Sequence, residues 1–94
     1  MNKKLVLIVD DEKDIRNIIK YNLEQENLKC ITASDGDEAL KKLNESPDLI
    51  ILDIMMPSLD GYEVCRTIRN QGNTVPIIFL TAMDREFDLS LIHI

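Results

Sequence analysis

DLIILDIMMPSLDGYE, residues 48–63, begins with a short apolar run that ends at an aspartate, Asp53. A continuous apolar run of this length is typical of a strand that is buried on both faces of a sheet. An aspartate at the end of such a strand can shape a turn, ligate a metal or act as a nucleophile. The choice depends on which residues the rest of the chain places beside it.

Three more expected strands alternate with stretches of helical spacing. The strands are the apolar runs 5–9 and 76–80 and the shorter stretch 29–33, KCITA, and the helical stretches are residues 11–26, 34–46 and 62–71. This alternation predicts parallel strands joined by right-handed crossovers, and therefore an α/β layered sheet. The strands begin on average about 24 residues apart, so a fifth unit would need a chain of roughly 120 residues. We expect this chain of 94 residues to stop after its fourth strand.

The composition is that of one soluble globular domain, with 45% hydrophobic and 30% charged residues. The net charge of −6 argues against a nucleic-acid-binding surface, because phosphates are bound by concentrated Lys and Arg. The apolar run 5–9 ends in two acids and is too short for a signal peptide or a membrane span. Cys30 and Cys65 lack metal-ligand spacing and are interpreted as buried thiols of a reduced, cytoplasmic protein, with a disulfide left open.

Polar residues follow three of the expected strands at the same edge of the sheet. Asp10 and Asp11 follow the first strand, Asp53 the third and Thr81 the fourth. If the first and third strands are neighbours, three carboxylates converge, and two such charges about 4 Å apart repel by roughly 4 kcal/mol. The cluster must then hold a proton or bind a cation, and oxygen ligands favour Mg²⁺. Taken singly, Asp53 is more often a turn former, Asp11 a helix cap and Thr81 a hydroxyl bonded to its own loop.

Three motifs at these positions together resemble one known family. VDD at residues 9–11, D-x-x-M-P-x-x-D-G at 53–61 and LTA at 80–82 resemble the receiver domain of bacterial two-component response regulators. The resemblance runs from Lys4 to about Asp88 and implies a flavodoxin-like, doubly wound parallel sheet of order 2-1-3-4-5 in the complete domain. Residues 1–88 are accordingly identified as a receiver domain that lacks its fifth βα unit.

The resemblance also implies a role for each site residue. Asp53 would accept a phosphoryl group from a sensor histidine kinase or a phosphotransfer protein, acting as a nucleophilic carboxylate. Mg²⁺ would be held by Asp10, Asp11, Asp53 and the backbone carbonyl of Met55. Thr81 would donate a hydrogen bond to the phosphoryl group, and the small side chain of Ala82 would leave that group room. Pro57 and Gly61 would shape the loop. The protein would assist its own phosphorylation and dephosphorylation without being a dedicated enzyme.

Two features depart from the family pattern. The lysine and the aromatic residue that the family carries on its fifth strand have no match here. Residues 89–94, LSLIHI, leave the pattern abruptly, and one back-translation of them resembles a transposon end used in sequencing adaptors. We interpret them as a non-native tail, which the source DNA tests. Without a fifth unit we expect an unpaired sheet edge at residues 76–80 and partial exposure of Val6, Ile8 and Ile50.

Partners and alternatives follow from the same resemblance. A kinase is expected to dock on the first helix, with Ile15 or Ile18 as the exposed edge of its apolar stripe. The output is expected to be transcriptional, through a DNA-binding domain absent from this chain, and the longer protein is expected to form receiver homodimers without a membrane partner. The nearest alternative is a pseudo-receiver that acts only as an interaction module. An FMN- or nucleotide-binding module would need a Gly/Ser/Thr phosphate loop after the first strand, and a haloacid-dehalogenase-type phosphatase would need a D-x-D pair there.

Overall fold

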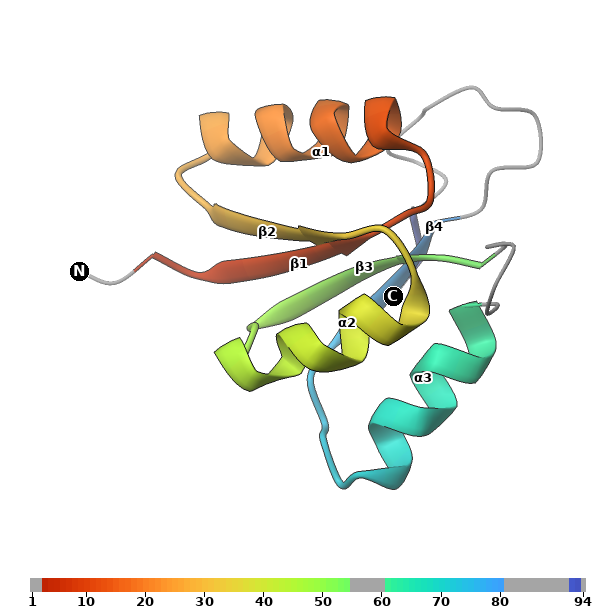
Figure 1. The fold of residues 1–94 in the computed structure, drawn as a ribbon. Helices are drawn as coiled ribbons and strands as arrows, with labels where there is room; N and C mark the ends of the chain where they lie inside the picture. The colour runs from red at the N-terminus through yellow and green to blue at the C-terminus, as the bar shows by residue number, and fades with distance from the viewer. Residues whose placement is uncertain (1–2, 55–60, 81–91, 94) are drawn as a thin grey trace.

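The computed structural model describes residues 3–54, 61–80 and 92–93, and in these ranges strands alternate with helices (Figure 1). The elements in chain order are β1 (Leu5–Val9), α1 (Lys13–Gln25), β2 (Lys29–Ala33), α2 (Gly36–Lys42), a 3₁₀ turn (Leu43–Glu45), β3 (Leu49–Asp53), α3 (Gly61–Asn70), β4 (Ile77–Leu80) and β5 (Ile92–His93). The strands form one sheet in the order β2-β1-β3-β4-β5, and the first four are parallel. Helix α1 covers one face, and α2 and α3 cover the other. The predicted α/β fold with strand order 2-1-3-4 is confirmed.

Strand β1 lies between β2 and β3, and its register decides where the acidic residues meet. Val9 is level with Ala33 of β2 and with Leu52 of β3. The residues that follow Val9 and Leu52 are Asp10 and Asp53, so the carboxyl ends of the two strands bring these acids side by side. Asp53 itself belongs to β3, whose ladder to β4 continues through this residue. The strand therefore ends one residue later than the sequence predicted.

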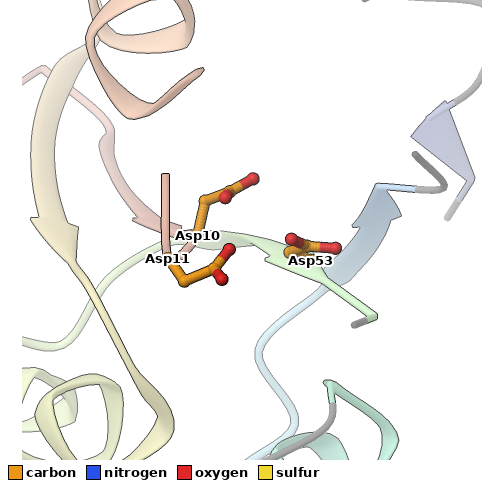
Figure 2. Close-up of side chains that lie close together, drawn as sticks. All are labelled: Asp10, Asp11 and Asp53. Carbon is orange, nitrogen blue, oxygen red and sulfur yellow. The ribbon is translucent and has the colours of Figure 1, made fainter. Parts of the chain in front are cut away.

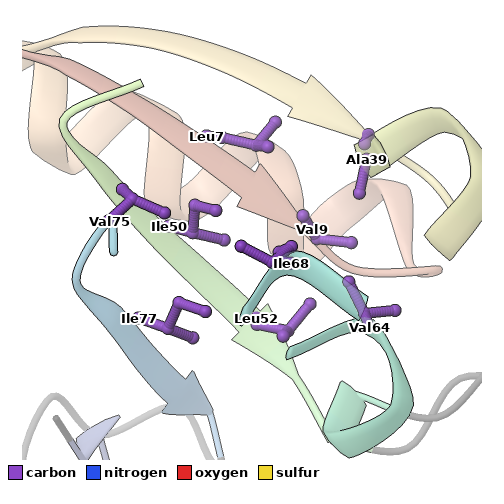
Figure 3. Close-up of a cluster of buried hydrophobic side chains, with 10 residues drawn as sticks. Leu7, Val9, Ala39, Ile50, Leu52, Val64, Ile68, Val75 and Ile77 are labelled. Carbon is purple, nitrogen blue, oxygen red and sulfur yellow. The ribbon is translucent and has the colours of Figure 1, made fainter. Parts of the chain in front are cut away.

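An apolar core lies on each face of the sheet. Adjacent residues of β1 and β3 point into opposite cores, which is why these runs are apolar throughout. The core under α2 and α3 includes Leu7, Val9, Ile50, Leu52, Val64 and Ile68 (Figure 3), and the core under α1 includes Val6, Ile8, Ile19, Ile51 and Leu80. Cys30 belongs to the second core and Cys65 packs against the first. The sheet thus separates two free thiols, and burial raises the pKa of Cys30.

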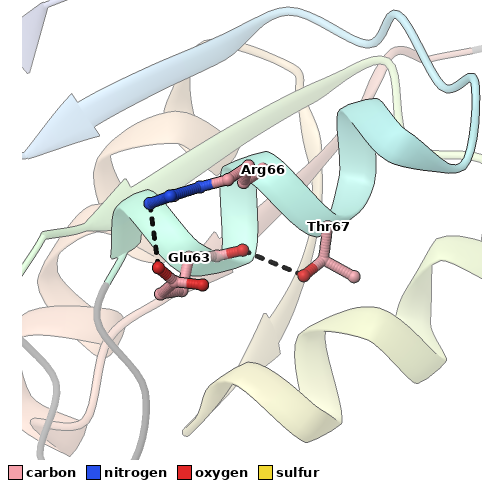
Figure 4. Close-up of polar contacts among 3 residues, drawn as sticks. All are labelled: Glu63, Arg66 and Thr67. Carbon is pink, nitrogen blue, oxygen red and sulfur yellow. Dashed lines mark hydrogen bonds and ion pairs between the residues drawn. The ribbon is translucent and has the colours of Figure 1, made fainter.

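Helix α3 is held by its buried face and only weakly by its exposed one. Val64 and Ile68 are fully buried, and each such side chain is worth about 1.5–3 kcal/mol. On the exposed face, Arg66 and Glu63 form an ion pair of 2.9 Å, and the Thr67 hydroxyl donates to the Glu63 carbonyl at 3.0 Å (Figure 4). An exposed pair at this spacing contributes only about 0.2–0.5 kcal/mol. Packing against the sheet therefore contributes more to the stability of α3 than the exposed ion pair does.

The C-terminal end of α1 lies where the sequence predicted it, and the N-terminal cap does not. Asn27, expected to end the helix, has a φ of 65°, the left-handed conformation that commonly follows a helix. The N-cap is Glu12 and no side chain caps the helix, so the expectation that Asp11 is the cap was wrong. The backbone N–H of Glu12 instead donates to Asp10 Oδ1 at 2.9 Å. The acid directly after β1 thus serves both the turn and the site.

Two further expectations are corrected by the structure. Strand β4 is not left unpaired, because Phe79 and Leu80 pair antiparallel with His93 and Ile92 of β5. Val6, Ile8 and Ile50 are also not partly exposed, since none of the three exceeds 1% exposure. Helix α1 covers these residues on one face of the sheet, and α2 and α3 cover them on the other. The interpretation of residues 1–88 as an incomplete domain and 89–94 as a non-native tail stays a prediction.

Helices of the described ranges are short and amphipathic. None of them has the length and apolar character that a membrane crossing requires.

Candidate functional site

Three carboxyl groups meet at the carboxyl edge of the sheet. Asp10 and Asp11 come from the segment after β1, and Asp53 ends β3 (Figure 2). One oxygen of each lies within 4.8 Å of one oxygen of the other two. The predicted convergence of the three acids is therefore confirmed, and it follows from the register of β1 against β3.

The three acids differ in their surroundings. Asp10 is 1% exposed and Asp53 6% exposed, whereas Asp11 lies in solvent. Asp10 Oδ1 accepts the Glu12 N–H, and Asp10 Oδ2 is buried without a hydrogen-bond partner among the described residues. A buried carboxylate oxygen that no donor satisfies is costly unless a proton or a cation meets it. Asp10 is therefore the acid most in need of a ligand.

The charge of the cluster changes the protonation of Asp10. Burial, above all, and then the neighbouring charge of Asp53 and the contact and charge of Asp11 raise the pKa of Asp10 from 3.8 to about 8, while Arg16 opposes the rise. Two unit charges 4.8 Å apart at an effective dielectric near 20 repel by about 3.5 kcal/mol. A proton on Asp10 relieves this repulsion, and a bound cation relieves it more completely.

The donor set fits a small, hard dication. All three ligands are carboxylates, one of their oxygens is buried and unsatisfied, and one of the three acids is open to solvent, so that water molecules can complete the coordination. Oxygen ligands with several waters are what Mg²⁺ prefers in proteins. The described residues of this cluster can therefore hold a metal ion.

Gly61 fixes the backbone on which Asp53 stands. Its N–H donates to the Ile54 carbonyl at 2.7 Å, which ties the start of α3 to the end of β3. A Cβ at this position would lie 2.2 Å from the Asp53 carbonyl oxygen and 2.8 Å from Ile54 Cα. Both obstacles are backbone, so they cannot turn aside as a side chain can. Sequence reasoning placed Gly61 in the loop, but it did not find that the space beside Asp53 demands glycine.

Arg16 is a site neighbour that sequence reasoning missed. Its Nη1 donates to the Asp10 carbonyl oxygen at 2.7 Å. A lone arginine in a polar helix face gives no signal of such a contact, because the bond depends on how α1 docks on the sheet. The other expected site residues, Met55, Thr81, Ala82 and Pro57, lie outside the described residues, and their roles stay predictions. Leu80, directly before Thr81, is level with Asp53.

Comparison with known proteins agrees with this geometry. The family model of the response regulator receiver domain matches residues 6–91. The chain is 57% identical over 89 residues to the alkaline phosphatase synthesis transcriptional regulatory protein PhoP of Bacillus subtilis, covering 94% of this chain and 37% of PhoP. The chain belongs to the response regulator receiver family. It is also 48% identical over 84 residues to the probable transcriptional regulator ycf27 of Cyanophora paradoxa, covering 88% of this chain and 35% of ycf27.

A solved receiver structure extends the likeness to three dimensions. The response regulator TrrA of Thermotoga maritima, solved in complex with Mg²⁺-BeF, is 45% identical with a TM-score of 0.80 and covers 93% of this chain and 77% of TrrA. This receiver chain spans only about a third of the length of its curated relatives. Family membership sets aside the FMN-binding module and the haloacid-dehalogenase-type phosphatase as interpretations of the acidic residues.

The pKa of Asp10 predicts how the stability of this receiver varies with pH. Without divalent cations, the stability gained from a protonated Asp10 is fully present below about pH 3.8 and is lost as the pH rises through about 8. Asp10→Asn mimics the neutral acid, so at pH 9 we expect its free energy of unfolding to exceed that of the wild type by about 1–3 kcal/mol. At pH 4 the two proteins should be equal in urea unfolding. A variant that is less stable than the wild type at pH 9 would contradict this electrostatic account.

The space around Gly61 predicts an unequal response of two glycines to alanine. Gly61→Ala must displace the backbone of Asp53 or Ile54, and we expect it to cost about 2–4 kcal/mol. Gly72→Ala is the matched control: nothing lies within 4 Å of its Cβ, and only its φ of 80° strains it, at a cost of about 1 kcal/mol. Urea unfolding of both variants measures the difference. Equal losses would show that the tip of β3 can move aside freely.

Proposed function

We propose that the chain is the phosphoacceptor module of a two-component response regulator, which receives a phosphoryl group on Asp53 in the presence of Mg²⁺. The observation that supports this most directly is the unsatisfied buried oxygen of Asp10 beside Asp53. The cluster needs a proton or a cation, and a cation bound there would lie next to the Asp53 carboxylate. Placement and charge neutralisation are most of what phosphoryl transfer requires.

The reaction is a substitution at phosphorus. A carboxylate oxygen of Asp53 forms a bond to the phosphorus of a phosphohistidine, the P–N bond breaks, and the imidazole nitrogen keeps the electron pair and takes up a proton. The product is an acyl phosphate on Asp53. Asp10 and Asp11, with the carbonyl of Met55, would hold Mg²⁺, which neutralises charge on the phosphoryl oxygens. Thr81 would donate its hydroxyl to the transferred group, and Ala82 would leave it room.

Support for Mg²⁺ as the ion comes from the donor set and from one relative. Carboxylate oxygens with an open solvent side suit Mg²⁺ better than softer metals. The related regulator TrrA was solved with Mg²⁺-BeF. The reaction would be an assisted self-phosphorylation and not turnover by a dedicated enzyme, since Asp53 is consumed in each event until the acyl phosphate hydrolyses.

A sensor histidine kinase or phosphotransfer protein is the proposed donor, docked on α1. The helix begins two residues after Asp11, so a protein seated on its first turns can reach Asp53. Ile19 is buried at 3% exposure, whereas Ile18 is 48% exposed. Ile18 is thus the exposed edge that was expected for the apolar stripe of α1. Ile15, the other candidate, is half-buried. The curated relatives are transcriptional regulators, so we propose a cytoplasmic protein whose output acts on DNA through a further domain.

The pseudo-receiver alternative keeps the fold and lacks the chemistry. It would explain the docking surface on α1 but not the unsatisfied oxygen of Asp10, which serves no purpose in a module that binds neither cation nor phosphoryl group. Phosphorylation by acetyl phosphate with Mg²⁺ separates the two functions.

Substitution of the acids predicts different losses. Asp53→Asn should abolish phosphate incorporation from acetyl phosphate, because an amide oxygen is not a competent nucleophile here. Asp11→Asn should keep incorporation at high Mg²⁺ but raise the Mg²⁺ concentration it requires by at least about tenfold, because one charged ligand is lost. Intact-protein mass spectrometry gives the extent of labelling. Stoichiometric phosphate on the Asp53→Asn protein would assign the acceptor to another residue.

The exposed isoleucine predicts a defect that is specific to the protein donor. Ile18→Ala should slow transfer from a phosphorylated histidine kinase by about tenfold, as expected for an apolar contact worth 1–2 kcal/mol. Its labelling by acetyl phosphate should equal that of the wild type, because a small donor does not need α1. Lys41→Ala, an exposed change on α2 at the opposite face, is the control for surface substitution. Unchanged kinase transfer in Ile18→Ala would place the docking surface elsewhere.

A further inference from the structure

The turn between β1 and α1 is closed by a ring of three hydrogen bonds. The Glu12 N–H donates to Asp10 Oδ1 at 2.9 Å, and the Arg16 N–H donates to the Glu12 carbonyl at 3.1 Å. The Arg16 side chain completes the ring, because its Nη1 donates to the Asp10 carbonyl at 2.7 Å. The N–H of Asp10 donates to the Ala33 carbonyl of β2 at 3.2 Å. The backbone of Asp10 is therefore held on both sides, by β2 and by Arg16.

Helix formation alone does not explain a cation at this position. Arg16 lies near the start of α1, where the helix dipole favours acids over bases. It is half-buried, so its charge is partly removed from water. Its guanidinium reaches back to the Asp10 carbonyl at the acidic edge of the sheet. The carbonyls at the C-terminal end of the helix, which stabilise cations, lie in the other direction. The bond to the Asp10 carbonyl thus ties this arginine to the acidic site.

The bond acts on the acid with the unsatisfied oxygen. Repulsion from Asp53 and Asp11 pushes Asp10 away from the cluster. Among the described residues, the Glu12 N–H bond to Oδ1 and the Arg16 bond to the Asp10 carbonyl oppose that push. A carboxylate that swings away can no longer present its buried Oδ2 to a cation. Preorganised ligands bind metals more tightly because no ordering is needed on binding.

We propose that Arg16 is a positioning residue of the acidic site: by holding the Asp10 carbonyl it fixes the Asp10 carboxylate for cation binding and so sets the Mg²⁺ affinity of this receiver. The proposal rests on the proposed function, and it adds a residue that touches neither the cation nor the phosphoryl group. The direction of the change in Mg²⁺ affinity distinguishes this role from an effect of charge alone. If the guanidinium acted only by its charge, removing it would tighten binding of a dication, whereas loss of the tether weakens it.

The test compares Arg16→Met with Arg16→Lys, and uses Lys20→Met as the matched control. Lys20 is a half-buried cation one turn further along α1, where its charge acts on Cys30 and is not among those that shift the pKa of Asp10. Mg²⁺ affinity is measured by isothermal titration calorimetry at pH 7.5 and pH 9, and phosphate incorporation from acetyl phosphate is measured at saturating Mg²⁺. We expect Arg16→Met to weaken Mg²⁺ binding about three- to tenfold at both pH values, with incorporation at saturation within about twofold of the wild type.

Two further variants show whether Arg16 acts through its hydrogen bond to Asp10, through its charge, or only through the stability of the fold. Arg16→Lys, which keeps one donor and the charge, should recover part of the affinity, and Lys20→Met should match the wild type. Tighter binding in Arg16→Met, an unchanged affinity, an effect confined to pH 7.5, or an equal loss in Lys20→Met would each overturn the proposal. A wild-type protein that neither binds Mg²⁺ nor takes up phosphate would instead refute the proposed function itself.

Discussion

Repulsion between three carboxylates at one edge of a parallel sheet is the constraint on which the site depends. Because Val9 is level with Leu52, the acids that follow β1 and end β3 cannot avoid one another. Asp10 and Asp53 are buried, so water screens them poorly, and this pair repels by about 3.5 kcal/mol when both carboxyl groups are charged. A domain of this size is stable by only about 5–15 kcal/mol. The cluster is therefore tolerable only with a proton or a cation in it.

The scaffold resists this repulsion in three ways. Strands β1 and β3 are apolar on both faces and locked between two cores, so they cannot part to separate the acids. Gly61 lets the start of α3 approach the Asp53 carbonyl, which fixes the end of β3. Arg16 of α1, the helix on the other face of the sheet from α3, donates to the Asp10 carbonyl and holds the end of β1. The acids are thus preorganised where a cation can bridge them, and the proposed phosphoryl transfer would use this arrangement.

The sequence predicted the strands and helices that follow from local residue patterns. It did not predict the contacts that form when distant segments pack against one another. The strand at residues 5–9 follows from a short apolar run, and the convergence of Asp10, Asp11 and Asp53 follows from parallel topology. The start of α1 was misplaced by one residue, because the sequence favoured Asp11 as the cap and the observed N-cap is Glu12. The reason for Gly61, the contact of Arg16 and the pairing of β4 with β5 depend on how distant segments approach, which periodicity does not encode.

The most direct test of the account is the thermal unfolding of the wild-type protein at pH 8 with and without Mg²⁺ at constant ionic strength. A ligand at ten times its Kd adds about 1.4 kcal/mol, which raises the Tm of a domain of this size by roughly 6–11 °C. We predict a rise of this order for the wild type and almost none for the protein in which Asp10 and Asp53 are both asparagine. An equal rise in both proteins, or none in the wild type, would contradict the claim that these carboxylates form a cation site.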